Sequence, residues 1–247
     1  MNIFDQYADF CPERSVVTIG TFDGVHLGHR RILFALRRLA RQLNSDMGVI
    51  TFYPHPRKAL YQDSNVHNLT SLNEKIKLFR KLGVEHLMLL HFTPELSGLS
   101  AKGFLQEIIM ERMRPAHIVM GYDHAFGKGR KGDFAFMEQK SLRYGFGLSR
   151  VGPREIAGKP VSSSRLRYVL SQGSLKWGHR LLGRRYSLRG RVVRGEGRGG
   201  DLGFPTANLE LDDSDKLLPP DGVYDAITYF PKEAQSYRSL VNIGDNP

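Results

Sequence analysis

Apolar and amphipathic stretches alternate over the first 150 residues of the chain. Four apolar runs, rich in β-branched residues, predict buried strands at residues 15–22, 47–53, 85–92 and 117–120. The segment after the first run has apolar residues at helical spacing from Ile32 to Leu43, with arginines largely between them. Strands that alternate with helices indicate right-handed β-α-β units. The pattern therefore predicts an α/β fold with a parallel sheet.

Local signals add further helices to this plan. Ser71 and Glu74 form a capping-box pattern that opens a helix, and Gly83 ends it. A helix is also expected through Phe104, Ile108 and Ile109, and two short helices near 163–172 and 174–182. In parallel sheets of this kind, ligands bind outside the carboxyl ends of the strands. The segments 21–29, 53–56 and 123–132 follow predicted strands and are the places to look for chemistry.

The pattern of apolar residues and of Gly and Pro changes after residue 183. Short β-like runs separated by Gly and Pro occupy residues 186–193, 206–211, 222–230 and 239–244. This spacing is typical of an antiparallel barrel or meander. We therefore expect two domains, at residues 1–183 and 184–247.

Charge and cysteine content narrow the range of functions. The net charge of the chain is +11, and residues 150–200 alone contain thirteen Lys or Arg and two acids, Glu155 and Glu196. A basic field of this kind attracts polyanions, whether nucleotides, nucleic acids or anionic membranes. Cys11 is the only cysteine, which excludes an internal disulfide and fits a reducing cytoplasm. No apolar stretch approaches the roughly 18 residues of a membrane-spanning helix, and no signal peptide is expected.

A His-Leu-Gly-His segment directly follows the first predicted strand and opens the first helix. The first amides of a helix lack intrahelical acceptors and attract phosphate. His26 and His29 are three residues apart and so lie on one face, while Gly28 lets a nucleotide approach the backbone. The plainer alternative is a pair of surface histidines at a helix start. The position after the first strand of an α/β sheet favours the phosphate site.

Two further segments carry polar groups suited to anions. The segment 162–167 (SSSRLR) combines hydroxyls with guanidiniums at a predicted helix start, although a plain N-cap with solvated arginines would look the same. The glycine cluster at 195–200 could turn its amides toward an anion. Beyond it, Thr206 and Asn208 offer oxygens to a magnesium ion that carries phosphates. A flexible hairpin loop is the alternative for this cluster.

The motifs in their order resemble the bacterial FAD synthetase family, bifunctional riboflavin kinases/FMN adenylyltransferases of the HxGH nucleotidyltransferase superfamily. The resemblance rests on TIGTFDGVHLGH at 18–29, TFYPHP at 51–56, GYDHAFGKGRKGD at 121–133 and VSSSRLR at 161–167. Downstream, GEGRGGDLGFPTANL, DGVY and VNIGDNP resemble the riboflavin kinase module. The resemblance implies a Rossmann-like nucleotidyltransferase domain followed by an incomplete antiparallel β-barrel.

The resemblance also implies roles for residues. It assigns catalysis to His26, His29 and Arg167. It assigns binding of ATP, FMN or riboflavin to a larger set: Gly20, Phe22, Gly28, Asp123, Phe126, Ser163, Ser164, Gly197, Thr206 and Asn208. Thr206 and Asn208 would also meet Mg²⁺. His124 stands where the family usually has Phe, and Ser164 where it usually has Thr.

The implied activity is transfer of AMP from ATP to FMN, which gives FAD and pyrophosphate, together with phosphorylation of riboflavin to FMN. The kinase half is expected to be inactive, because family members continue beyond a segment like VNIGDNP to reach the acidic catalytic base. Two alternatives remain: a nucleotidyltransferase for another small phosphorylated substrate, and a basic nucleic-acid-binding protein. Small molecules are the expected partners, with no nucleic acid and no membrane, and the sequence leaves the oligomeric state open.

Overall fold

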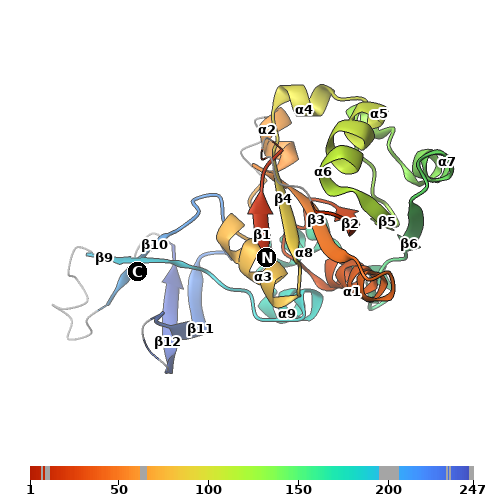
Figure 1. The fold of residues 1–247 in the computed structure, drawn as a ribbon. Coiled ribbons are helices and arrows are strands. Elements are labelled where there is room, and N and C mark those ends of the chain that lie inside the picture. The colour runs from red at the N-terminus through yellow and green to blue at the C-terminus, as the bar shows by residue number, and fades with distance from the viewer. Residues whose placement is uncertain are drawn as a thin grey trace. The chain divides into compact units, whose positions relative to one another are not determined.

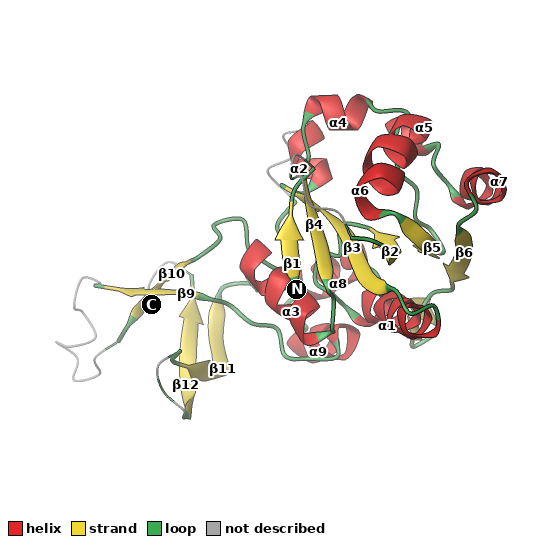
Figure 2. Ribbon diagram, viewed as in Figure 1, coloured by secondary structure: helices red, strands yellow, loops and turns green. Residues whose placement is uncertain are grey.

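The structure is a computed structural model that describes residues 1–6, 8, 12–61, 66–194, 206–231, 233 and 235–244. It divides into two compact units, Met1–Ser162 and Ser163–Pro247. Figure 1 and Figure 2 show the first unit as a sheet with helices on its faces and the strands of the second unit as short ladders. Each unit is described by itself.

The first unit is built on one six-stranded sheet. Its strands are β1 (Asn2–Phe4), β2 (Ser15–Ile19), β3 (Asp46–Tyr53), β4 (His86–His91), β5 (Pro115–Gly121) and β6 (Gly147–Val151). They lie in the order β1-β4-β3-β2-β5-β6, and every neighbouring pair is parallel. This confirms the predicted α/β fold with a parallel sheet. Successive crossovers run outward from β2 through β3 to β4, whereas β5 lies on the other side of β2, so the topology reverses between β2 and β5.

Helical segments connect these strands. They are α1 (Leu27–Gln42), α2 (Pro56–Tyr61), α3 (Leu72–Lys81), α4 (Pro94–Gly98), α5 (Ala101–Gly103), the π-helix η1 (Phe104–Met110), α6 (Glu111–Met113), the 3-10 helix η2 (Lys128–Arg130) and α7 (Phe134–Tyr144). The capping box of α3 is confirmed: Ser71 Oγ accepts from Glu74 N, and Glu74 Oε2 accepts from Ser71 N. A two-stranded hairpin of β7 (Glu155–Ile156) and β8 (Lys159–Pro160) completes the unit.

The strands bury side chains on both faces of the sheet. On one face, Val16 and Val49 pack with Leu33 and Leu36 of α1 and with Phe79 of α3. On the other face, side chains from β2, β3, β4 and β5 pack with those of the π-helix and of α7. Because alternate residues of a strand point to opposite faces, burial on both sides explains why these strands read as continuous apolar runs.

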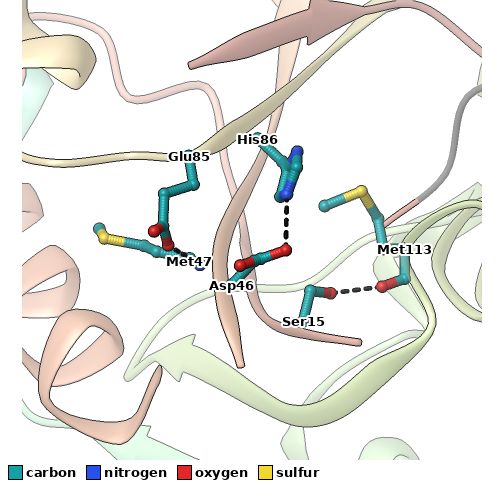
Figure 3. A network of polar contacts seen from close by, with 6 residues as sticks. All are labelled: Ser15, Asp46, Met47, Glu85, His86 and Met113. Carbon is teal, nitrogen blue, oxygen red and sulfur yellow. Dashed lines mark hydrogen bonds and ion pairs between the residues drawn. The ribbon is translucent and has the colours of Figure 1, made fainter. Parts of the chain in front are cut away.

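Polar contacts tie the amino ends of the strands together (Figure 3). His86 Nε2 and Asp46 Oδ2 are 2.9 Å apart, and Glu85 Oε2 accepts from Met47 N at 2.7 Å. Ser15 Oγ donates to the Met113 carbonyl. The first two contacts join the start of β3 to the start of β4, and the third joins β2 to the segment that enters β5. They fix strand register at the amino ends of the strands, whereas the HxGH segment lies at the carboxyl ends.

The second unit begins with α8 (Ser163–Ser171) and α9 (Leu175–Leu182). Among its described residues, β9 (Gly190–Val193) pairs antiparallel with β10 (Asn208–Leu211), and β11 (Gly222–Tyr229) pairs antiparallel with β12 (Ser236–Ile243). The predicted change to antiparallel strands is therefore confirmed. Within the described ranges, no helix is both long and apolar enough to cross a membrane.

Candidate active site

The loops at the carboxyl ends of β2 and β5 lie at the point where the strand order reverses. In open parallel sheets this switch point is where ligands bind. Residues 20–26 lead from β2 into α1, and residues 122–127 follow β5. Because β2 and β5 are neighbours, residues 20–26 and residues 122–127 both lie at the switch point of the sheet.

His26 and His29 form a stacked pair at the start of α1. His26 is the N-cap residue, and its Nδ1 accepts from His29 N at 3.3 Å. The two rings lie 3.6 Å apart between centroids, with an interplanar angle of 17°. Because Nδ1 of His26 is an acceptor, the neutral ring carries its proton on Nε2. His26 is thus prepared to donate a hydrogen bond from Nε2.

Burial keeps His29 in its neutral form. The pKa of His29 is held well below its ordinary value, first by burial and then by His26 and Lys75. Its Nδ1 is buried and has no hydrogen-bond partner among the described residues. The Phe22 ring meets the imidazole edge-on at 5.1 Å between centroids. Ring contacts on two sides therefore fix the orientation of a neutral imidazole.

Asp23 anchors the loop between β2 and α1. Its carboxylate is 1% exposed and accepts from Leu69 N at 3.0 Å and from Thr70 N at 3.1 Å. Gly24 N in turn donates to Thr70 Oγ1 at 3.1 Å. A buried carboxylate with several amide donors is strongly held. This clamp joins the loop to residues 46 positions later in the chain.

Gly28 allows the chain to pass close to the first turn of α1. A Cβ at this position would lie 2.9 Å from the Val161 carbonyl oxygen and 3.1 Å from His26 Nδ1. Any side chain would displace one of these groups. The close approach observed at Gly28 is therefore that of the protein's own chain, and the approach of a nucleotide stays a prediction.

Other predicted binding residues of the first unit lie near these loops. Gly20 N donates to the Ile50 carbonyl at 3.0 Å and extends the pairing of β2 with β3. Phe22 is buried and also packs edge-on against Phe79 at 5.5 Å. Asp123 is exposed, and its carbonyl accepts from Arg130 Nη2 at 3.0 Å. Phe126 is 5% exposed and packs against Phe104 in the core, so its observed contacts are structural.

The remaining predicted residues belong to the second unit. Ser163 and Ser164 open α8, and Arg167 lies one turn later. Thr206 precedes β10 and Asn208 begins it, and both are exposed. Gly197 lies outside the described residues. The meeting of these groups with His26 and His29 stays a prediction.

A separate cavity of about 320 Å³ lies at the amino ends of the strands. Its lining includes Arg37, Arg41, Asp46 and Glu85. None of the predicted site residues contributes to it. It lies beyond the amino ends of the strands, where ligands of parallel sheets do not usually bind.

Two residues at the carboxyl edge escaped sequence reasoning. Neither Asp23 nor Lys75 is among the site residues that the sequence predicts. Lys75 is 7% exposed, and its Nζ donates to the Thr21 carbonyl at 2.9 Å. The available signal was its place on the apolar face of the helix, one turn before Phe79.

Two family models match successive parts of the chain. The family model described as FAD synthetase matches residues 9–165, and that described as riboflavin kinase matches residues 182–247. The bifunctional riboflavin kinase/FMN adenylyltransferase of Escherichia coli K12 is 33% identical over 95% of this chain and 74% of its own length. That of Bacillus subtilis is 35% identical over 95% of this chain and 73% of its own length.

A solved structure is similar over the same extent. The crystal structure of a protein described as a macrolide-efflux protein from Streptococcus pneumoniae matches with a TM-score of 0.85 and 31% identity. The match covers 97% of this chain and 77% of that one. The similarity therefore extends over both units.

Proposed function

The chain belongs to the family of bifunctional riboflavin kinases/FMN adenylyltransferases, and on that premise we propose that its first unit transfers AMP from ATP to FMN. The observation that carries this assignment is the stacked pair of His26 and His29 at the switch point of the sheet. The products are FAD and pyrophosphate. The second unit carries the riboflavin kinase module, which phosphorylates riboflavin to FMN.

Adenylyl transfer is a displacement at the α-phosphorus of ATP. An oxygen of the FMN phosphate forms the new P–O bond, and the bond to the bridging oxygen of pyrophosphate breaks. No covalent bond to the protein is needed. Catalysis therefore consists of positioning the two substrates and neutralising the charge that develops on the phosphoryl oxygens.

The first turn of α1 supplies donors for that charge. His26 Nε2–H and the first amides of the helix are directed by the N-cap geometry, and His29 adds a neutral imidazole. A neutral ring contributes by hydrogen bonding rather than by charge. The arrangement is fixed before substrate binds, because the Asp23 clamp and the Phe22 ring hold the loop.

We assign binding of the outer phosphates to the start of α8. Ser163 and Ser164 offer hydroxyls, and Arg167 offers a planar guanidinium suited to phosphate oxygens. The assignment rests on the resemblance of residues 161–167 to the family motif. Asp123 and Phe126 are assigned to the part of the site that binds the flavin of FMN, because residues 121–133 resemble the family motif.

Mg²⁺ fits the chemistry as a companion of the nucleotide. In the kinase module, Thr206 and Asn208 offer the neutral oxygen ligands that such an ion accepts beside phosphates. Among the described residues, no group of three or more His, Cys, Asp or Glu is arranged to hold a metal by itself. The ion would therefore arrive with ATP, whose charge it neutralises. We place the enzyme in the cytoplasm because its single thiol, Cys11, suits a reducing compartment.

The proposal is tested with purified protein, Mg-ATP and FMN, by following FAD and pyrophosphate. Replacing His29 with Ala should slow FAD formation about a hundredfold, or about 2.7 kcal/mol, as for a lost donor at a developing charge. His86→Gln, at the opposite edge of the sheet, is the matched control. Full activity of His29→Ala would contradict the role of His29, and equal turnover of nicotinamide mononucleotide would contradict the acceptor.

The kinase reaction is assayed separately. Riboflavin and ATP are supplied without FMN, and FMN is followed by chromatography. The activity of the family predicts FMN formation. Absence of FMN, from protein that does form FAD when FMN is supplied, would contradict the assignment of kinase activity to this chain.

A further inference from the structure

Lys75 is a buried lysine on a helix that carries none of the predicted site residues. It lies on α3, but its side chain reaches across to the loop after β2, where Nζ donates to the Thr21 carbonyl at 2.9 Å. Lysine is almost never this buried unless its charge is paired, because removing an ammonium from water is costly. The burial of Lys75 therefore calls for a compensating role.

Hydrogen bonding to Thr21 alone does not account for a charge at this position. The Thr21 carbonyl also accepts from Thr51 Oγ1 at 3.1 Å, so a neutral donor is already present. A hydroxyl or an amide could supply a second donor without the desolvation cost of an ammonium. The positive charge itself needs an explanation.

Two titratable groups interact electrostatically with Lys75. Burial lowers the pKa of Lys75, and the first of these groups, Asp23 in the loop after β2, opposes that shift by favouring the charged lysine. The second is His29, whose pKa is lowered by burial first and then by the neighbouring His26 and Lys75. Lys75 therefore interacts both with a buried carboxylate and with the imidazole of His29.

We propose that Lys75 is a positioning residue for adenylyl transfer, which holds Thr21 at the entrance of the phosphate-binding loop and maintains a fixed positive charge beside His29. The role rests on the proposed function of this site. A fixed cation disfavours a second positive charge on the adjacent imidazole, so His29 stays neutral at working pH. It also adds to the positive field at the place where phosphoryl charge develops.

Three substitutions separate the charge from the hydrogen bond. Lys75→Gln keeps a donor for Thr21 and removes the charge, Lys75→Arg keeps the charge, and Lys75→Met removes both. Lys77→Gln changes an exposed lysine on the same helix and is the matched control. We expect kcat for FAD formation to fall about tenfold in the Gln and Met variants, with KM for ATP and FMN changed much less.

The pH profile tests the electrostatic part of the role. Without the lysine charge the pKa of His29 rises, so the imidazole becomes protonated at a higher pH. The acid limb of kcat against pH should therefore move to higher pH in Lys75→Gln and stay in place in Lys75→Arg and Lys77→Gln. A merely structural lysine would alter stability or all kinetic constants without moving the limb, and that result would overturn the proposal.

A direct titration makes the test independent of turnover. The His29 ring is titrated by NMR in the substrate-free protein and assigned by its loss in His29→Gln. A higher pKa of His29 in Lys75→Gln or Lys75→Met, but not in Lys75→Arg, supports the proposal, and unchanged values refute it. If the wild-type protein forms no FAD, the proposed function fails, while the titration still decides the role of Lys75. Two neutral variants ensure that a folding defect in one does not end the test.

Discussion

Replacing His124 with Phe should make the protein more resistant to acid. His124 follows β5 at the carboxyl edge of the sheet, and its Nε2 is buried with no hydrogen-bond partner among the described residues. Burial, reinforced by Arg130, lowers the pKa of His124 from 6.5 to about 4. The ring lies 6.2 Å from that of Phe126, so a phenyl ring can occupy the same aromatic surroundings.

The sign and size of the effect follow from proton linkage. Since the folded-state pKa lies below the unfolded value, the unfolded chain binds the proton first as pH falls, and stability declines from near pH 7 down to about pH 4. The full difference is about 3 kcal/mol, of which about 2 kcal/mol is lost between pH 7 and pH 5. The His124 side chain as a whole is partly exposed, which makes these figures upper bounds.

The assay is urea unfolding of wild-type and His124→Phe protein at pH 7 and at pH 5. At pH 7 the two should agree within about 1 kcal/mol, because Nε2 of the ring has no hydrogen-bond partner among the described residues that the substitution could remove. At pH 5 the variant should be more stable by up to about 2 kcal/mol. His91→Phe, at an exposed position of β4, is the matched control. Equal losses of stability in wild-type and His124→Phe would refute the reasoning, since His124 would then not be a buried neutral imidazole.

Three further predictions concern the loop, a helix cap and the domain boundary. Gly28→Ala should lower kcat/KM for FAD formation at least about tenfold, because its Cβ meets the Val161 carbonyl and His26; Gly98→Ala, where a Cβ meets nothing within 4 Å, should not. Ser71→Ala removes half of a capping box and should cost about 1 kcal/mol in urea unfolding. A chain that ends at Leu182 should stay folded by circular dichroism and keep adenylyl transfer, whereas unfolding would move the predicted boundary away from residue 183.

The sequence predicted the strands that are buried on both faces. β2, β3, β4 and β5 are continuous apolar runs, and the predicted ranges overlap the observed ones. β1 and β6, at the two edges of the sheet, were not predicted. β1 has three residues, and β6 contains Ser149 and Arg150 and has no fully buried residue. Edge strands carry a weaker apolar pattern because neighbouring strands and helices cover less of them.

The sequence predicted where the helix through Phe104 lies but not that it is a π-helix. The segment through Phe104 and Ile108 was expected to be helical, but the structure has a π-helix over Phe104–Met110 between two short α-helical turns. The apolar spacing that marks a helix does not distinguish i→i+4 from i→i+5 hydrogen bonding over so few residues. Tertiary packing decides, and here Phe104, Leu105, Ile108 and Ile109 are all buried.

In the candidate site, the sequence predicted the residues that are close together in the chain and missed those that act through contacts between distant segments. His26, Gly28 and His29 are close in sequence, so a local motif was enough to bring them together. Asp23 and Lys75 act over distances that no local pattern contains: the Asp23 clamp closes on Leu69 and Thr70, and Lys75 reaches Thr21 across 54 residues. On its own helix Lys75 is a cation at an apolar position, which sequence reasoning treats as a snorkelling side chain.

The backbone of the loop shows why such distant contacts are needed. Phe22 and Val25 have φ values of 49° and 38°, in the left-handed region that residues with a Cβ rarely adopt, and a β-branched residue least of all. Each such residue costs of order 1 kcal/mol or more and persists only where the surroundings determine it. Here both side chains are buried, Asp23 between them is clamped, and Val25 N donates to the Phe22 carbonyl at 3.0 Å. The fold therefore holds the strained turn that presents His26 and His29, and the substrates need not supply the free energy to form it.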